Sequence, residues 1–287
     1  MHNKKQKHKS AASVVWSRVW NAPGARFGII VFVIMVLAAV FAPLLTPYDY
    51  ATPDLLHSFA LPSFSHILGT DELGRDMYTR IIFGARYSLG IASLSTVIAL
   101  FIGMVFGSIA GYFGGMADNI IMRIFDVIQS IPGILLSIVV AIVLGNNAFN
   151  LVLALAVVAI PGYARVLRAQ ILSIRKMEYI EAAVATNCSV PRILMGYVIP
   201  NAMAPLIVQM TMQFPGQIIA TSSLAYIGLG IQPPTPEWGA MLNSAKEYIT
   251  KAPLTILIPG IAIIIAVLCL NMIGDGMRDA LDPRLKK

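Results

Sequence analysis

The sequence predicts an all-α integral membrane protein with six transmembrane helices. Apolar residues make up 57% of its 287 residues and charged residues only 12%, whereas soluble domains usually carry ~25% charged residues. Six long runs with almost no charge are each close to the ~20 residues that cross a hydrocarbon core. Lys and Arg gather in alternate connecting segments, as in a chain that crosses a membrane repeatedly.

The predicted spans follow from these runs, and their orientation follows from the basic residues. The spans are residues 27–45, 89–112, 120–144, 148–167, 202–229 and 254–273. If the N-terminus is cytoplasmic, 15 of the 21 Lys and Arg residues fall in inner segments. The positive-inside rule therefore favours a cytoplasmic N-terminus and a cytoplasmic C-terminus. The first run is longer than the ~7–15 apolar residues of a signal peptide, so we expect an uncleaved anchor.

The connecting segments define the rest of the organisation. We expect a basic cytoplasmic head, a first transmembrane anchor, an extracytoplasmic segment that ends in an interfacial helix, a five-helix core and a cytoplasmic tail. The respective residues are 1–26, 27–45, 46–88, 89–273 and 274–287. In the head, Trp16 and Trp20 lie four residues apart and so share one helix face, which suits the membrane interface.

The sequence lacks the motifs that several kinds of enzyme require. The chain has no P-loop, no H-E-x-x-H and no G-x-S-x-G sequence, which are signatures of nucleotide binding, metalloproteases and serine hydrolases. The four histidines lie outside the spans, and Cys188 and Cys269 are too far apart along the predicted topology to pair. We therefore expect no catalytic residue, no metal site and no bound cofactor. The net charge of +7 is explained by membrane orientation, so no nucleic-acid partner is expected.

Residues 173–201, between two apolar runs, are polar and basic, and at 29 residues the segment is far longer than the usual loop of ~2–8 residues. Ser173 is a good N-cap for a helix that runs through Thr186. Glu178 and Glu181 would lie on one face of it, beside the small residues Ala182 and Ala183.

A turn and a second short helix should follow. Asn187 tolerates the left-handed conformation that ends helices. Ser189 can cap the next helix, with Pro191 in its first turn, and that helix should end before Pro200. The result would be a two-helix knob in the cytoplasm, suited to docking.

Two rows of residues recur every four positions. Gly103, Gly107, Gly111 and Gly115 predict a helix face that packs closely on a neighbour, with ligand contact as the alternative. A polar row in the fifth span either lines a hydrophilic route or bonds a neighbouring helix, and the sequence leaves both open. The row is Gln209, Gln213, Gln217 and Thr221.

One pair of charges lies inside a predicted span. Arg123 and Asp126 are three residues apart, so they share a helix face and can pair. We interpret the pair as structural, with a role in a gate or proton relay as the alternative.

Four stretches together resemble the permease subunits of binding-protein-dependent ABC importers. Glu181-Ala182-Ala183, the turn at Asn187 and Ile199-Pro200-Asn201 resemble the EAA loop of these subunits. The segments GTDELGRDMYTRIIFGARYSL, YIGLGIQPPTPEWGAML and GDGMRDALDPRL are similar to the dipeptide/oligopeptide/nickel group, C-subunit type. The chain departs from the family at Asn187, where Gly is common, and at Ile199, where Leu is.

The resemblance implies a type I ABC importer permease in a bacterial cytoplasmic membrane. The loop would couple to a cytoplasmic ATPase through Glu178, Glu181, Ala182, Ala183, Asn187 and Pro200. The implied partners are a second permease subunit, two ATPase subunits that bind ATP and Mg²⁺, an extracytoplasmic substrate-binding protein and the lipid bilayer. The expected function is to form half of a translocation pathway for short peptides. Import of nickel or a metal chelate, a self-contained secondary carrier and a membrane assembly factor are the alternatives.

Overall fold

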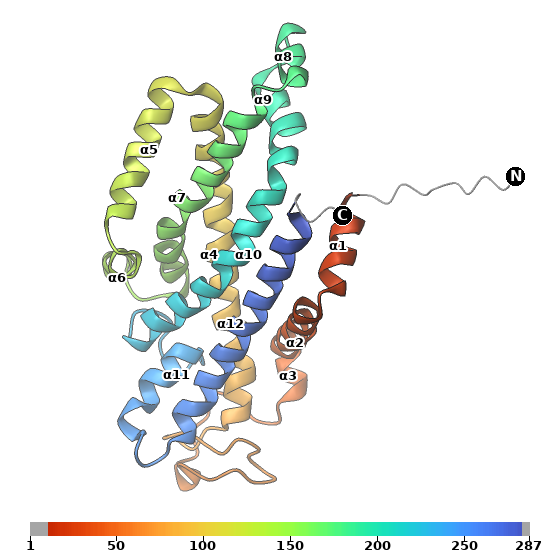
Figure 1. The fold of residues 1–287 in the computed structure, drawn as a ribbon. Coiled ribbons are helices and arrows are strands. Elements are labelled where there is room, and N and C mark those ends of the chain that lie inside the picture. Colours follow the sequence, from red (N-terminus) through yellow and green to blue (C-terminus); the bar gives the residue numbers. More distant parts are fainter. Residues whose placement is uncertain (1–10, 283–287) are drawn as a thin grey trace, which may run out of the picture.

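The computed structural model describes residues 11–282, and these form an all-helical molecule without a β-strand (Figure 1). The parts of the basic head and of the tail at residues 1–10 and 283–287 lie outside the described residues. Five helices are long and apolar enough to cross a membrane, and a bent pair of helices supplies a sixth crossing if it is taken as one span. The predicted number of spans therefore agrees with the structure.

The N-terminal layer begins with α1 (Ala11–Asn21), followed by α2 (Pro23–Val40) and the single turn α3 (Ala42–Leu45). Pro23 lies in the first turn of α2, where its missing N–H costs little. The first span thus starts earlier than predicted and is interrupted at Phe41. The outer segment that follows contains only the short 3₁₀ helix η1 (Leu55–His57).

The second span is α4 (Met77–Phe113), a helix of 37 residues. At 1.5 Å per residue it is about 55 Å long, well beyond a hydrocarbon core of about 30 Å. Asp76 caps it by accepting a hydrogen bond from the Thr79 N–H at 2.7 Å. The predicted interfacial helix is therefore the first part of α4, because nothing interrupts the helix between the two segments.

The prediction of one continuous helix over 120–144 is wrong. The segment forms α5 (Gly115–Ser130) and α6 (Gly133–Leu144), which meet at 95°. Ile131 between them has extended backbone with ψ 132°, because a residue before a proline is disfavoured in the helical region. Pro132 thus ends α5 and redirects the chain.

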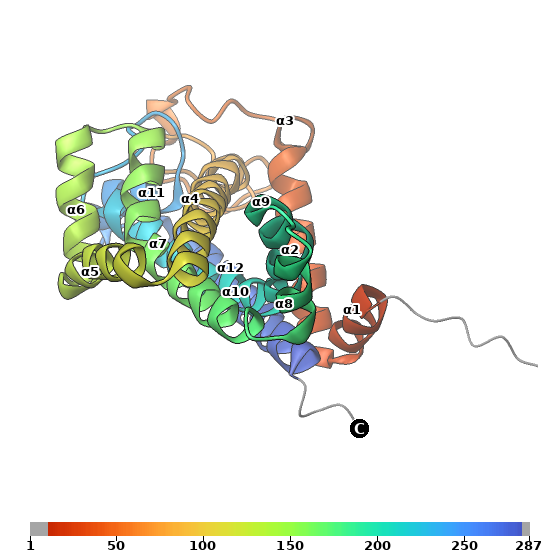
Figure 2. The same ribbon diagram turned by 90° about the horizontal axis from the view of Figure 1, so that it is seen from above.

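The remaining core consists of α7 (Ala148–Ile174), α10 (Ile199–Tyr226) and α12 (Leu254–Leu281). They lie beside α4, with α5 and α6 on one flank and α1 to α3 on the other (Figure 2). Each is longer at one or both ends than its predicted span. They contain Pro161, Pro205, Pro215 and Pro259 without ending there.

The glycine row of α4 lies against α7. A Cβ atom on Gly107 would lie 2.6 Å from the Ala164 carbonyl oxygen, and one on Gly103 would lie 2.7 Å from the Tyr163 Cβ. One on Gly111 would lie 2.9 Å from the Ile171 Cβ. These glycines let the two backbones approach more closely than any side chain would permit. The prediction is wrong for Gly115, which begins α5 and has no atom within 4 Å of its Cβ position.

The two ends of the molecule differ. One end carries α8 (Glu178–Ala185) and α9 (Val190–Ile193), with α1 and the C-terminal end of α12 on the same side (Figure 1). The other end carries the 46–76 segment, α11 (Trp238–Ala245) and the 3₁₀ helix η3 (Lys246–Tyr248). The end with α8 is the basic one, as expected for a cytoplasmic face.

Candidate coupling surface and transport route

The projection at the basic end is built from α8 and α9, and we call residues 178–193 the knob. α8 begins after Met177, whose backbone is extended, and not at Ser173 as predicted, because α7 continues through Ile174. Glu178 and Glu181 lie in the first turn of α8, where the positive end of the helix dipole favours carboxylates. Both side chains are exposed.

The turn after α8 has the geometry predicted for it. Asn187 has a φ of +57°, its N–H donates to the Val184 carbonyl at 2.9 Å, and the Cys188 N–H donates to the Ala183 carbonyl at 3.0 Å. These two bonds form a Schellman motif, which closes the helix and fixes the direction of the chain.

The underside of the knob is packed against the long helices. Ile180, Ile193 and Val198 are buried in one cluster with Leu167 and Leu206 of α7 and α10. Ala183 belongs to this cluster as well, so it faces inward, whereas Ala182 and Val184 are exposed. The knob, α7 and α10 therefore form one packed unit.

The second helix of the knob does not end before Pro200. Ser189 occupies its N-cap position, without a side-chain capping bond, and Pro191 lies in its first turn. A π-helical turn, η2 (Leu194–Val198), then leads directly into α10, where Pro200 lies in the first turn. The chain therefore stays helical through the proline, and the change of helical pitch lies directly before it.

A cavity of about 310 Å³ lies between α5, α6, α7 and α10. Its polar lining comes from Gln129, Ser137, Gln213 and Gln217, and none of the residues that line it is charged. The Gln213 Oε1 atom is buried without a hydrogen-bond partner. Gly162 of α7 also lines the cavity, and a Cβ on it would lie 2.7 Å from the Gln213 Nε2 atom.

Only two residues of the predicted polar row, Gln213 and Gln217, therefore line the cavity. Gln209 and Thr221 do not line the cavity. Thr221 is fully buried and donates to the carbonyl oxygen of Gln217 in its own helix at 2.8 Å. Gln217 also accepts a long hydrogen bond, 3.5 Å, from Ser95 of α4. Sequence reasoning missed Gln129, Ser137 and Gly162, because they reach the cavity from other helices.

The structure also gives Asp126 a different ionic partner from the predicted Arg123. Asp126 of α5 accepts a hydrogen bond from Arg165 of α7 at 2.7 Å, so its ionic partner lies 39 residues away and is not Arg123. A second ion pair joins the same helices, since Arg168 donates to Asp118 through two nitrogens, one of them at 2.6 Å. α5 is therefore tied to α7 by side chains that no local spacing indicates.

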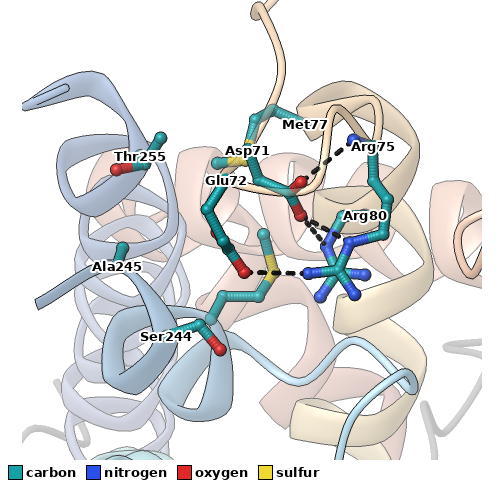
Figure 3. A pocket seen from close by; sticks show the side chains of 9 residues that line it. Asp71, Glu72, Arg75, Met77, Arg80, Ser244, Ala245 and Thr255 are labelled. Atoms are coloured by element: carbon teal, nitrogen blue, oxygen red, sulfur yellow. Dashed lines mark hydrogen bonds and ion pairs between the residues drawn. The ribbon is translucent and has the colours of Figure 1, made fainter. Parts of the chain in front are cut away.

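At the outer end, charged side chains of the 69–80 segment form a buried network (Figure 3). The Arg75 Nε donates to Asp71 at 2.7 Å, and Arg75 also reaches Glu72 at 3.0 Å. The Arg80 Nε lies 3.2 Å from Asp71, and Arg80 donates to the Tyr50 carbonyl at 2.9 Å. Ser244 and Thr255 complete a space of about 10 Å³ beside these groups, room for about one water molecule. The network fastens the outer loop to α4, and α11 and α12 border the space beside it.

A buried carboxyl group links α11 to α4. Glu237 caps α11 by accepting from the Ala240 N–H at 2.8 Å and accepts from the Ser88 hydroxyl at 2.7 Å. It is fully buried. Burial raises the pKa of the Glu237 carboxyl, and the Ser88 hydrogen bond opposes that rise.

The fold and these surfaces define a multi-pass membrane protein with a packed knob projecting at one end and a polar cavity between its helices. The family model described as "Binding-protein-dependent transport system inner membrane component" matches residues 103–287. That of the "N-terminal TM domain of oligopeptide transport permease C" matches residues 10–62. The chain belongs to the family of binding-protein-dependent transport system inner membrane components, the permease subunits of ABC importers.

Relatives extend over most of the chain. It is 43% identical to the dipeptide transport system permease protein DppC of Alkalihalophilus pseudofirmus, over 90% of this chain and 85% of that protein. It is 38% identical to the oligopeptide transport system permease protein OppC of Bacillus subtilis, over 92% and 86%. It is 39% identical to the glutathione transport system permease protein GsiD of Escherichia coli, over 94% and 90%.

A solved structure shares the fold. An inward-facing structure of the MetNI methionine ABC transporter superposes with a TM-score of 0.55 at 18% identity, over 72% of this chain and 97% of that chain. This agrees with the predicted type I importer permease architecture.

Proposed function

We propose that this chain forms half of the translocation pathway of an ATP-driven importer of short peptides. Its partners would be a second permease subunit, two cytoplasmic ATPase subunits that bind ATP and Mg²⁺, and an extracytoplasmic substrate-binding protein. The relatives named for dipeptide and oligopeptide transport support peptides as the substrate class.

One structural relationship carries the proposal. α7 and α10 hold the knob at one end, and the same two helices line the polar cavity through Gly162, Gln213 and Gln217. A push on the knob would therefore move the walls of the cavity. ATP binding can drive this movement only because ATP would bind one of two conformations more tightly.

The residues of the coupling loop would have different roles. Glu178, Glu181 and Ala182 are exposed and would contact the ATPase. Ala183 is packed inward, so its role would be to hold α8 close to α7 and α10. Asn187 would fix the turn and Pro200 the junction with α10.

The cavity lining fits a neutral, hydrogen-bonding cargo. Amide and hydroxyl side chains can bond passing peptide groups without retaining a charge. The unpartnered Gln213 Oε1 atom would accept from an N–H group once α10 moves. Gln209 and Thr221 do not line the cavity and would act in packing.

The test is peptide uptake into proteoliposomes that contain the complete complex, with ATP inside or absent. The proposal predicts uptake that requires ATP and falls severalfold in Gln213→Leu at saturating binding protein, while Gln209→Leu retains most of it. Uptake without nucleotide would indicate a secondary carrier. Uptake of a nickel chelate in place of peptides would leave the coupling intact but overturn the substrate class.

A further inference from the structure

The N-terminal helix α1 has three distinct faces. Val15 and Val19 pack inward, and Val19 is only 1% exposed. Trp16 and Trp20 stack with their ring centroids 6.2 Å apart, yet they are 56% and 41% exposed. Ser17 and Asn21 follow on the next face around the helix and are exposed too. The stacked, exposed tryptophans form an apolar patch beside a polar face, and such patches mark contacts with proteins or membranes.

Packing fixes the depth of α1. Val19 and Ala25 form a cluster with Ala280, near the end of α12. A Cβ on Gly276 would lie 2.3 Å from the Ala25 Cβ, so the α12 end and the start of α2 are in close contact. The neighbouring charged residues Asp275, Arg278 and Asp279 mark this level as the boundary between hydrocarbon and cytoplasmic water, since charges at bilayer depth are costly.

The tryptophan pair is followed along the chain by an exposed apolar surface on α2. On α2, Phe27, Ile30 and Ile34 are exposed at 59%, 46% and 59%, as expected for a span at the edge of the bundle. α1 and α2 together form one flank of the molecule (Figure 2).

The charge of this region matches a phospholipid surface. The first 48 residues hold six Lys and Arg and no Asp or Glu. Of the described members, Arg18 lies between the two tryptophans and Arg26 follows them along the chain. Basic residues near a membrane surface are attracted to anionic headgroups by about 1 kcal/mol each.

We propose that α1 lies in the cytoplasmic headgroup layer, with Trp16 and Trp20 inserted among phospholipids and Ser17 and Asn21 toward water. Tryptophan favours this layer because its ring is apolar and its N–H is polar. α1 thereby fixes the height of the α2–α12 pair in the bilayer. Because α1 packs mainly on α2 and α12, the knob and its helices would remain free to move. This inference does not depend on the substrate or on the ATPase.

A depth measurement by spin labelling tests the proposal. Trp20→Cys and Ser17→Cys are each placed in a chain that also carries Cys188→Ser and Cys269→Ala, assembled with partner subunits that lack accessible cysteines. The complexes are reconstituted in nanodiscs of phosphatidylethanolamine and phosphatidylglycerol. Collision of the label with oxygen, which concentrates in lipid, is compared with collision with the water-soluble nickel(II) ethylenediaminediacetate.

The proposal predicts that the ratio of oxygen to nickel collisions is severalfold higher at position 20 than at the matched control position 17. A label at Trp16→Cys should agree with position 20, which guards against a local distortion in one variant. Equal nickel access at positions 17 and 20 would contradict the proposal, because the tryptophan face would then be in water. Exclusion of both reagents at positions 16 and 20 would also overturn it, since a protein surface would cover them.

Discussion

The Ser88 hydroxyl donates to the Glu237 carboxylate at 2.7 Å and accepts from the Trp238 N–H at 3.1 Å. Ser88 therefore joins the N-terminal half of α4 to the first turn of α11. Trp238 adds a bond from its indole N–H to the Ile81 carbonyl at 3.1 Å. α11 is thus held between the core helices by polar contacts in a buried place, where an unpaired group is costly.

Replacing Glu237 separates the role of its shape from that of its charge. Glu237→Ala loses the α11 cap, worth about 1 kcal/mol, and leaves Ser88 without its acceptor, at a cost of about 1–3 kcal/mol. We expect a lower melting temperature for the purified complex, measured by a thermal-shift assay. At low pH, where Glu237 is protonated, Glu237→Gln keeps both shape and charge and should melt close to the wild type. Equal melting of the Ala and Gln variants would contradict this role.

The stability of the wild type should also depend on pH through Glu237. Because burial raises its pKa in the folded state, the folded protein binds the proton more tightly than the unfolded one. Stability from this group is complete below the ordinary value of 4.5 and declines as pH rises through the folded pKa. Glu237→Gln removes this dependence, so the melting difference between Gln variant and wild type should shift in favour of Gln as pH rises. A constant difference over the pH range would contradict the raised pKa.

The close approach of α4 and α7 predicts a large difference between two glycines of one helix. Gly107→Ala places a methyl group 2.6 Å from the Ala164 carbonyl oxygen, and overpacking of this kind typically costs about 1–3 kcal/mol. Gly90→Ala is the matched control, since no atom lies within 4 Å of its Cβ position. We expect a reduced yield and melting temperature for Gly107→Ala only. Similar melting for both variants would show that the helices separate easily.

The turn at Asn187 predicts an order of substitutions. Gly adopts a φ of +57° without steric cost, whereas a β-branched residue there costs about 1–2 kcal/mol. Asn187→Gly should retain ATPase activity stimulated by substrate-loaded binding protein, and Asn187→Val should lose much of that stimulation because α8 would be misplaced. The unstimulated rate of each complex is the control. Full stimulation in Asn187→Val would mean that the turn geometry is not needed for coupling.

The ion pair between Asp118 and Arg168 predicts that exchanging the two residues restores part of the stability lost in either single variant. Asp118→Asn weakens charge-assisted hydrogen bonds worth about 1.5–3 kcal/mol and should lower the melting temperature. In Asp118→Arg with Arg168→Asp, the pair re-forms with its members exchanged, and we expect a melting temperature above that of either single variant. A double variant that melts no higher than the less stable single one would assign the stability to other contacts of α5.

The sequence predicted the features that depend on local chemistry. Runs of apolar residues located the spans, and Asn187 marked a left-handed turn because few residue types tolerate that backbone. Pro132 shows the limit of local rules. It breaks the chain at 95°, whereas Pro161 and Pro215 lie inside continuous helices, since neighbouring helices decide whether a freed carbonyl is tolerated.

The candidate site was less accessible to sequence reasoning because it is assembled from distant segments. Arg123 and Asp126 have the spacing of a helical pair, but Arg165 from α7 takes the carboxylate. Only Gln213 and Gln217 of the polar row reach the cavity. The sequence predicted the exposed face of α8. Whether Ala183 faces outward or toward the bundle depends on how α8 packs on α7 and α10.

The most direct test of the account is photo-crosslinking from the knob in the assembled, transporting complex. A photoreactive amino acid is placed at Val184, which is 55% exposed, or at Glu181, with Phe64 on the outer loop as the control position. We predict that positions 184 and 181 capture the cytoplasmic ATPase, with a yield that changes when ATP binds, and that position 64 does not. Failure of both knob positions to capture the ATPase, in a complex shown to be intact and active, would contradict the claim that nucleotide energy enters this subunit through α8.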